Sequence, residues 1–322
     1  MPVFFLIGSA NDFLGFGSHG TVVYRGSLQG RAVAVKRLLQ DFVTLAEREV
    51  NILQESDDHP NVIRYYYQEA HANFLFIALE LCPASLADVI ERPDLHRDIS
   101  NGFVPKRALT QITSGLRHLH SLKIIHRDIK PQNILISAAR KGGTGVYAGH
   151  RMLISDFGLC RKLDADQTSF APTAYGAHAA GTIGWRAPEI LRGEVKIDES
   201  AVEDVSQSSR SSTGTATNGS VSGRGGDRPA RLTKSVDIFA LGCLYFYTLT
   251  SGEHPYGDRY EREANIFKDE KKLTPLEDLG EEGLEAIKLI ERMLDAEASK
   301  RYACIILCSF VVNDADNETQ QA

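Results

Sequence analysis

The chain has 322 residues, of which 43% are hydrophobic and 24% charged, a composition that excludes a largely disordered protein. Lys and Arg number 36 against 42 Asp and Glu, and the net charge of −6 argues against a surface that attracts nucleic acid or anionic lipid as a whole. Five scattered cysteines argue against a disulfide framework and indicate a reducing compartment. No apolar run approaches the roughly 20 residues of a membrane span, so we expect a soluble chain.

The first part of the chain predicts a small antiparallel sheet. Between Phe13 and Val35, apolar and polar residues alternate around glycines, which is the period of strands joined by tight turns. Residues 41–55 carry apolar side chains at helical spacing, and residues 73–81 read as a short apolar strand.

Helical patterns follow Cys82, over residues 85–121 and 235–251. The order of elements predicts an α+β fold with a small sheet lobe, carrying one helix, ahead of a larger helical lobe. We place the domain at residues 11–303, with the two lobes at 11–81 and 83–303.

Two polar segments interrupt these patterns. Residues 206–226 hold seven Ser, three Thr and five Gly and cannot bury enough apolar surface to offset their ordering entropy, so we predict a disordered insertion at residues 194–231. The shorter stretch 138–150 reads as a hairpin or loop between two strands.

A glycine-rich segment, Gly15-Phe16-Gly17-Ser18-His19-Gly20, lies between two strand patterns. A dinucleotide site would need its third glycine to open a helix, whereas this chain continues into the β-branched residues 21–23. The segment therefore indicates a hairpin folded over phosphates, with an ordinary glycine-rich hairpin as the alternative if nothing else followed.

A lysine and a glutamate follow at informative positions. Lys36 closes the apolar run Val33-Ala34-Val35 and is suited to pairing with the α and β phosphates of a nucleotide. Glu49 lies 13 residues on in the helical segment, where its carboxylate can hold that flexible lysine in place. Lys36 alone would read as a solvated strand end.

The strongest signal is His126-Arg127-Asp128-Ile129-Lys130-Pro131-Gln132-Asn133, followed by Asp156-Phe157-Gly158. Asp128 can orient an incoming hydroxyl and accept its proton, and Lys130 can neutralise a transferring phosphoryl group. Asn133 and Asp156 supply hard oxygen ligands for Mg²⁺. Ala187-Pro188-Glu189 closes the intervening segment, and motifs in this order and spacing do not recur by chance.

From about residue 13 to residue 301 the sequence resembles the eukaryotic protein kinases. The resemblance implies a two-lobed kinase fold that binds ATP and Mg²⁺ between its lobes, with Leu79 as gatekeeper. It implies the catalytic residues Lys36, Glu49, Asp128 and Lys130, the metal ligands Asn133 and Asp156, and the nucleotide-binding residues Gly15, Gly17, Gly20, Val22, Ala34, Lys36, Glu80, Cys82 and Leu135.

The same resemblance assigns structural roles. It implies that His126, Phe157 and Leu53 stack into the apolar column that couples the lobes. Asp237 matches the buried acid that braces the catalytic loop, and Arg301 matches the arginine that pairs with Glu189.

Lys130-Pro131 and Gly181-Thr182 look like the serine/threonine branch of the kinases. Arg127 beside the catalytic aspartate implies regulation by phosphorylation, since a cation there needs a partner anion. Ser169 is the first candidate for the phosphorylated residue, with Thr168 and Thr173 next, although each reads equally well as an ordinary polar loop residue.

A closer resemblance is to the inositol-requiring enzyme family, the sensors of the unfolded protein response. It rests on segments 57–65, 78–82, 154–160, 237–243 and 254–266, and the Ser/Gly-rich insertion suits a fungal member. In that family a lumenal sensor and one membrane span precede the kinase, which lies on the cytosolic side of the endoplasmic reticulum, and an RNA-cleaving domain follows. We expect this chain to be cytosolic, because the parent segments that would reach the membrane are absent from it.

The sequence departs from the family pattern after Arg301. Residues 304–322 form an atypical tail, which we interpret as a truncation ahead of the RNA-cleaving domain. We expect no nucleic-acid partner for this chain, and Cys304 and Cys308 lack the further ligands of a zinc site.

The sequence favours an active, Mg²⁺-ATP-dependent serine/threonine kinase that phosphorylates itself in trans within a homodimer. An alternative is a nucleotide-gated dimerisation switch whose phosphoryl transfer is secondary, although the intact Asp128 weighs against a pure pseudokinase. A ribonuclease, the third hypothesis, has no matching residues here.

Overall fold

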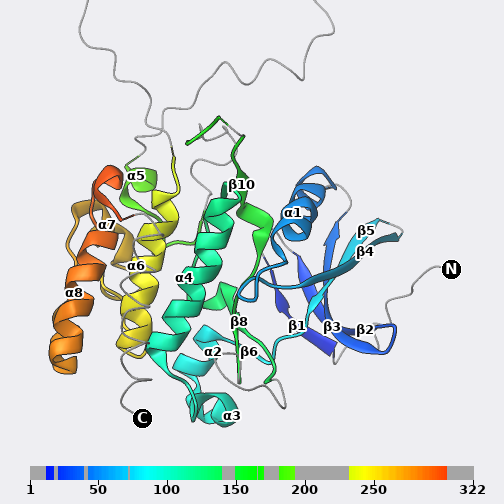
Figure 1. Cartoon of the computed structure of the whole chain (residues 1–322), viewed down its shortest axis with the longest axis horizontal. Helices are drawn as coiled ribbons and strands as arrows, with labels where there is room; N and C mark the ends of the chain where they lie inside the picture. Colours follow the sequence, from blue (N-terminus) through cyan, green and yellow to red (C-terminus); the bar gives the residue numbers. More distant parts are fainter. Residues whose placement is uncertain are drawn as a thin grey trace, which may run out of the picture.

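The computed structural model describes residues 12–17, 21–39, 43–71, 73–139, 149–164, 166–169, 181–192 and 232–302. These residues form two lobes, an antiparallel sheet with one helix and a larger group of helices (Figure 1). The predicted fold class, a two-lobed α+β fold with a small sheet lobe and a larger helical lobe, is confirmed. The predicted insertion at 194–231 and the tail at 304–322 lie outside the described residues.

The smaller lobe is a five-stranded antiparallel sheet in the order β1-β2-β3-β5-β4. A two-residue turn, Gln29-Gly30, joins β2 to β3 with both residues at positive φ, which suits the right-handed twist of a hairpin. The sequence patterns did not single out β4. The strands are β1 (Phe13–Phe16), β2 (Val22–Leu28), β3 (Arg31–Leu39), β4 (Tyr65–His71) and β5 (Phe74–Glu80).

Alternation along β3 gives the sheet two different faces. Val33 and Val35 form a small apolar cluster with Ala78 of β5 on one face. Leu38 and Ile77, on the opposite face, belong to the main hydrophobic core. Lys36 pairs with Ile77 in the register of β3 and β5, so it shares that second face.

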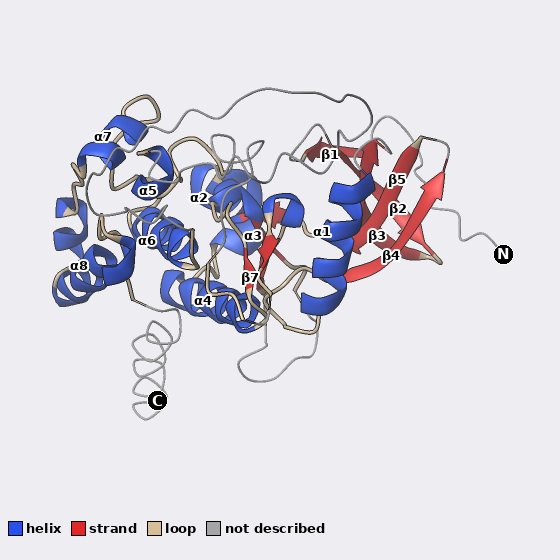
Figure 2. Ribbon diagram, turned by 90° about the horizontal axis from the view of Figure 1, so that it is seen from above, coloured by secondary structure: helices blue, strands red, loops and turns tan. Residues whose placement is uncertain are grey.

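The helix α1 (Val43–Ser56) lies against this sheet and confirms the helix predicted at 41–55 (Figure 2). Its buried residues include Glu49, Val50 and Leu53, which helical spacing brings to one side. The carboxylate of Glu49 is thereby carried into the interior next to the face that holds Lys36.

The larger lobe is built around α4 and α6. The region predicted as helical at 85–121 is divided into three helices, because Pro93 and Pro105 each open a new helical segment. All residues of α6 from Val236 to Thr248 are buried, as expected for a helix that is apolar or glycine at every one of these positions except Asp237 and Thr248. The helices are α2 (Leu86–Glu91), α3 (Arg97–Ser100), α4 (Pro105–Ser121), α5 (Pro188–Leu191), α6 (Ser235–Leu249), α7 (Arg262–Lys268) and α8 (Glu281–Met293). Within the described ranges, no helix is long and apolar enough to cross a membrane.

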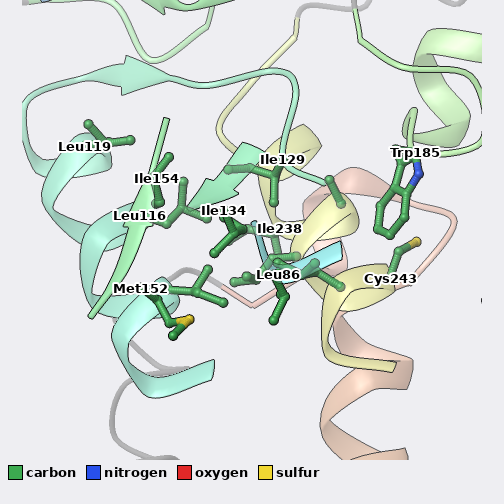
Figure 3. Close-up of a cluster of buried hydrophobic side chains, with 14 of the residues drawn as sticks. Leu86, Leu116, Leu119, Ile129, Ile134, Met152, Ile154, Trp185, Ile238 and Cys243 are labelled. Carbon is green, nitrogen blue, oxygen red and sulfur yellow. The ribbon is translucent and has the colours of Figure 1, made fainter. Parts of the chain in front are cut away.

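Side chains of the larger lobe form one continuous core, in which Leu116 of α4 and Ile238 of α6 lie near the strand residues Ile134 and Ile154 (Figure 3). Burying each such side chain contributes about 1.5–3 kcal/mol relative to exposure. The core therefore fixes the short strands on which the polar motifs depend.

Five short strands frame those motifs. β6, β8 and β9 form one small sheet, and β7 pairs with β10. The segment 126–133 connects β7 to β8, and only Ser155 separates Asp156 from the end of β9, so both motifs start from buried strands. The strands are β6 (Ala84–Ser85), β7 (Ile124–Ile125), β8 (Ile134–Ile136), β9 (Met152–Ile154) and β10 (Arg161–Lys162). The segment predicted at 138–150 does connect two paired strands, although its residues 140–148 lie outside the described part.

Candidate active site

Lys36 joins elements of both lobes. Its Nζ lies 2.6 Å from Glu49 Oε1 of α1 and 3.0 Å from Asp156 Oδ1, which follows β9. Burial alone would lower the pKa of Lys36, but the carboxylates of Glu49 and Asp156 outweigh burial and raise that pKa above its ordinary value. The ammonium group is therefore charged at neutral pH and held where it can bind an anion.

The segment between β7 and β8 gathers a second set of polar groups around Asp128. Lys130 Nζ donates to Asp128 Oδ2 at 2.8 Å, and Asn133 Nδ2 donates to the same oxygen at 2.8 Å. Thr182 Oγ1 donates to Asp128 Oδ1 at 2.6 Å and accepts from Lys130 Nζ at 2.6 Å. The carboxylate of Asp128 is thus oriented on both oxygens by charged or polar donors.

Thr182 is the member of this cluster to which sequence reasoning gave no role. Sequence analysis used Gly181-Thr182 only to assign the serine/threonine branch. The one sequence signal for a role of Thr182 in the site was its position shortly before Ala187-Pro188-Glu189. The contact joins residues 54 positions apart, so only the fold reveals it.

Asp237 of α6 binds the backbone at the start of the segment 126–133. It accepts hydrogen bonds from the backbone N–H groups of His126 at 2.8 Å and Arg127 at 2.7 Å, and His120 Nε2 lies 2.8 Å away. Burial alone would raise the pKa of Asp237, but these partners, His120 first, lower it. The resemblance-based expectation for Asp237 matches these contacts.

Two residues of the site adopt positive φ without being glycine, Arg127 at 69° and Asp156 at 64°. Such backbone conformations persist only where the surroundings hold them. Arg127 is held through Asp237, while Asp156 lies between Ser155 and Phe157, whose ring packs 5.5 Å from His126. Phe157, His126 and Leu53 are all buried, as expected for a column between the lobes.

Of the residues expected to bind the nucleotide, those that the structure describes come from both lobes. Gly15 and Gly17 lie on and after β1, where Gly17 N–H donates to Thr21 O at 2.9 Å, and Gly20 lies outside the described residues. A Cβ at Gly17 would come within 2.3 Å of Thr21 Oγ1, so a larger residue there would require the Thr21 side chain to move. Val22 and Ala34 lie on β2 and β3, and Leu135 lies on β8.

The segment Glu80–Cys82, called here the hinge, connects β5 to the larger lobe. Burial chiefly, and Glu80 in addition, raise the pKa of the Cys82 thiol to about 12, while Arg151 acts in the opposite direction. The thiol is therefore protonated and poorly nucleophilic at neutral pH.

Of the expected phosphorylation sites, Thr168 is exposed and Ser169 is half-buried, while Thr173 lies outside the described residues. Arg127, Arg161 and Arg48 interact electrostatically within the described part of the chain. Burial, and the charges of Arg161 and Arg48, lower the pKa of Arg127 against the opposing effects of Cys160 and Asp237. The three guanidinium groups thus form a local concentration of positive charge.

The predicted pair of Arg301 and Glu189 is present and bidentate. Arg301 Nη1 and Nη2 donate to Glu189 Oε1 and Oε2, each at 2.8 Å, and both side chains are buried. Arg301 also donates to the carbonyls of Asp295 and Ser235, which ties the end of α8 to α6. Its guanidinium satisfies several buried acceptors at once, which Lys cannot do.

This arrangement is that of a protein kinase, and the comparison with known families agrees. The protein kinase domain model matches residues 9–203, and the chain belongs to the protein kinase domain family. The sequence-based predictions of a protein kinase and of its serine/threonine class are confirmed, because the relatives of this chain are named serine/threonine-protein kinases.

More particularly, the chain is similar to the kinase part of larger kinase/endoribonucleases. It is 51% identical over 299 residues to the serine/threonine-protein kinase/endoribonuclease ireA of Aspergillus fumigatus and 44% identical over 293 residues to the sensor for unfolded proteins in the ER ire1 of Schizosaccharomyces pombe. The human serine/threonine-protein kinase/endoribonuclease IRE2 is 42% identical over 283 residues. These matches confirm the closer resemblance predicted from the sequence motifs.

The matches cover most of this chain but a small part of each relative. They include 92%, 90% and 88% of this chain, and 24%, 25% and 26% of the Aspergillus, Schizosaccharomyces and human proteins. The similarity therefore concerns the kinase region of those proteins.

Proposed function

We propose that this chain transfers the γ-phosphoryl group of ATP to a serine or threonine of a second copy of itself. The observation that carries the proposal is the presence of two polar clusters. In one, Lys36 contacts Glu49 and Asp156, and in the other, Asp128 contacts Lys130 and Asn133. The first is suited to hold phosphates and the second to orient and deprotonate a hydroxyl.

In this proposal Asp128 orients the attacking hydroxyl and accepts its proton. Lys130 and Thr182 hold the carboxylate of Asp128 in place, and the charge of Lys130 stabilises the transferring phosphoryl group. Lys36 binds the α and β phosphates of ATP, and its contact with Glu49 makes that binding depend on the position of α1. The adenine contacts the hinge backbone between Val22, Ala34 and Leu135.

The donor set also fits Mg²⁺, which prefers a few hard oxygen ligands and completes its shell with phosphates and water. Asn133 donates through its amide nitrogen to Asp128, which leaves its amide oxygen as the ligand-forming side. The backbone of Ser155 bonds to Asn133 O at 2.9 Å and so brings Asp156 beside Asn133. When bound between Asn133 and Asp156, the ion would neutralise the negative charge that develops on the phosphates.

The cluster of Arg127, Arg161 and Arg48 supports autophosphorylation of the neighbouring segment. A phosphate on Ser169, Thr168 or Thr173 would add an anion that these arginines could bind through charge-assisted hydrogen bonds. Ordering of the segment would follow from new charge-assisted hydrogen bonds, so the product of the reaction would stabilise the active arrangement.

We further propose that the chain acts in sensing unfolded proteins, on the cytosolic side of the endoplasmic reticulum. The support is the similarity to the Schizosaccharomyces sensor for unfolded proteins in the ER and to the kinase/endoribonucleases. The contact between Lys36 and Glu49 also suits a second function, a nucleotide-gated homodimer, since nucleotide bound at Lys36 would fix α1. In that alternative phosphoryl transfer is secondary.

A mixing experiment tests autophosphorylation in trans. The unsubstituted chain is incubated with labelled Mg²⁺-ATP and a longer, tagged Asp128→Asn chain, and Lys36→Ala serves as a second inactive control. We expect label on the tagged chain, mapped by mass spectrometry to residues 168–173. Label confined to the unsubstituted chain would contradict transfer in trans, and no label anywhere, with ATP still bound, would favour the dimerisation switch.

A further inference from the structure

Arg151 ties three separate segments together at the hinge. It directly precedes β9, and its Nη2 donates to Glu80 Oε1 at 2.7 Å. Its Nη1 donates to the carbonyl oxygen of Pro60, also at 2.7 Å, in the loop that follows α1. One guanidinium group of the larger lobe therefore holds both the hinge and a loop of the smaller lobe.

The base of Arg151 is fixed in the strand pair that carries Leu135. Ser137 N–H donates to Arg151 O at 2.9 Å, and Arg151 N–H donates to Ser137 Oγ at 3.0 Å. Leu135 on β8 lies opposite Leu153 on β9 in the same pair. Arg151 thus connects the strand pair β8 and β9, which carries the proposed adenine contact Leu135, to the hinge.

The contact is partly shielded from water, which strengthens it. The side chains of Arg151 and Glu80 are 12% and 17% exposed. Arg64 offers a contrast in the same region, since its Nη1 lies 3.6 Å from Asp57 Oδ2 and its side chain is 48% exposed. Exposed pairs of that kind contribute little, whereas charge-assisted bonds of good geometry are among the stronger ones.

We propose that Arg151 is a positioning residue for adenine, one that fixes the hinge relative to Leu135. The inference rests on the proposed binding of ATP. Adenine is recognised by the hinge backbone and by apolar side chains on either side, so a shift of the hinge relative to Leu135 weakens its binding. Lys36 and Asp156, which would hold the phosphates, are positioned by their own separate contacts.

This separation gives the test. Arg151→Gln is compared with the unsubstituted chain for binding of ATP and of magnesium tripolyphosphate, which lacks the adenosine, by calorimetry. Phosphoryl transfer is measured for KM and kcat at a temperature at which both chains are folded. We expect the affinity for ATP to fall about tenfold and the KM for ATP to rise to match, with tripolyphosphate affinity and kcat unchanged.

Three further variants separate positioning from folding. Arg64→Gln removes an arginine from the adjacent exposed pair and should leave ATP affinity unchanged. Arg151→Lys retains the charge but reaches only one acceptor, and should show a smaller loss than Arg151→Gln. The double variant, with Glu80→Gln added to Arg151→Gln, should bind ATP no more weakly than Arg151→Gln alone. The reason is that both substitutions break the same bond between Arg151 and Glu80.

Unchanged ATP affinity in folded Arg151→Gln would overturn the inference, as would an equal loss of ATP and tripolyphosphate affinity, which indicates a general structural role. A higher kcat of Arg151→Gln at unchanged ATP affinity would also overturn the inference, and it would show that Arg151 slows phosphoryl transfer. Failure of the unsubstituted chain to bind ATP would instead contradict the proposed function itself.

Discussion

Two carboxylate centres among the described residues are held in different ways. Glu49 and Asp156 meet Lys36 through side chains that come from three elements in two lobes. Asp237 accepts two backbone N–H groups from adjacent residues of its own lobe, with His120 as its third partner. The local backbone conformation fixes the positions of backbone donors, whereas contacts among side chains change when the elements that carry them move relative to one another. The first centre is thus suited to respond to a ligand and the second to hold shape.

The largest effect should come from substitutions in the first centre and at Asp128, the proposed base next to it. Asp156→Ala removes a ligand of the first centre and should abolish Mg²⁺-dependent ATP binding and turnover. Asp128→Asn should leave ATP affinity nearly intact while the rate of phosphoryl transfer falls by orders of magnitude, because it affects the hydroxyl and not the nucleotide. Binding and single-turnover measurements on both variants separate these roles, and equal loss of ATP affinity would contradict them.

A smaller but still large effect should follow Asp237→Asn. The amide nitrogen would face donors that now bond to a carboxylate, and breaking a buried charged interaction costs about 3–5 kcal/mol of unfolding free energy. Denaturant unfolding at neutral pH measures this loss. A change below about 1 kcal/mol would show that the second centre does not hold shape.

The pH dependence of this loss has a defined sign. The pKa of Asp237 is lower in the folded chain than in the unfolded chain, so its charge contributes stability above the unfolded pKa of about 4. That contribution disappears as the pH falls through the lower folded pKa. The pKa of Lys36 is raised, so its contribution is complete below its unfolded pKa of about 10.4 and is lost only at more alkaline pH. The difference between Asp237→Asn and the unsubstituted chain should therefore shrink in acid.

How far the sequence predicts this site depends on the kind of contact. Lys36, Glu49, Asp128, Asn133 and Asp156 could be predicted as site residues, because phosphate and metal chemistry requires those residue types near particular strands and helices. The contacts of Thr182 and Arg151 could not, since they join positions 54 and 71 residues apart whose meeting depends on tertiary packing.

The fold follows the same division. The apolar spacing of residues 41–55 and the unbroken apolar run of α6 predicted helices that are present. The strand β4 was missed, because its sequence, Tyr-Tyr-Tyr-Gln-Glu-Ala-His, gains its place by pairing with β5 and carries little apolar alternation of its own. The local sequence pattern predicted those elements whose own apolar residues form a buried face, and it missed the strand that depends on pairing with a neighbour.

A further substitution sharpens the comparison by testing how closely the larger lobe is packed. A Cβ at Gly242 of α6 would lie 2.8 Å from Met293 Cβ and 2.9 Å from Leu294 Cδ2. Gly242→Ala should therefore lower the free energy of unfolding by about 1–3 kcal/mol through overpacking. Gly102→Ala is the matched control, because nothing lies within 4 Å of a Cβ there, and its effect should be small. Equal effects of the two substitutions would contradict close packing of α6 on α8.

The smallest effect should follow deletion of residues 200–228. The Ser, Thr and Gly of this segment offer almost no apolar surface to bury, so the folded state loses little when they are removed. Shortening a long connection changes its closure entropy slowly, by about 0.6 kcal/mol for each doubling of length, so the melting temperature should change little. Because the contacts that hold both carboxylate centres among the described residues come from other parts of the chain, phosphoryl transfer should also persist. A large fall in melting temperature would show that the segment packs on the domain, which would overturn the predicted disorder of the insertion.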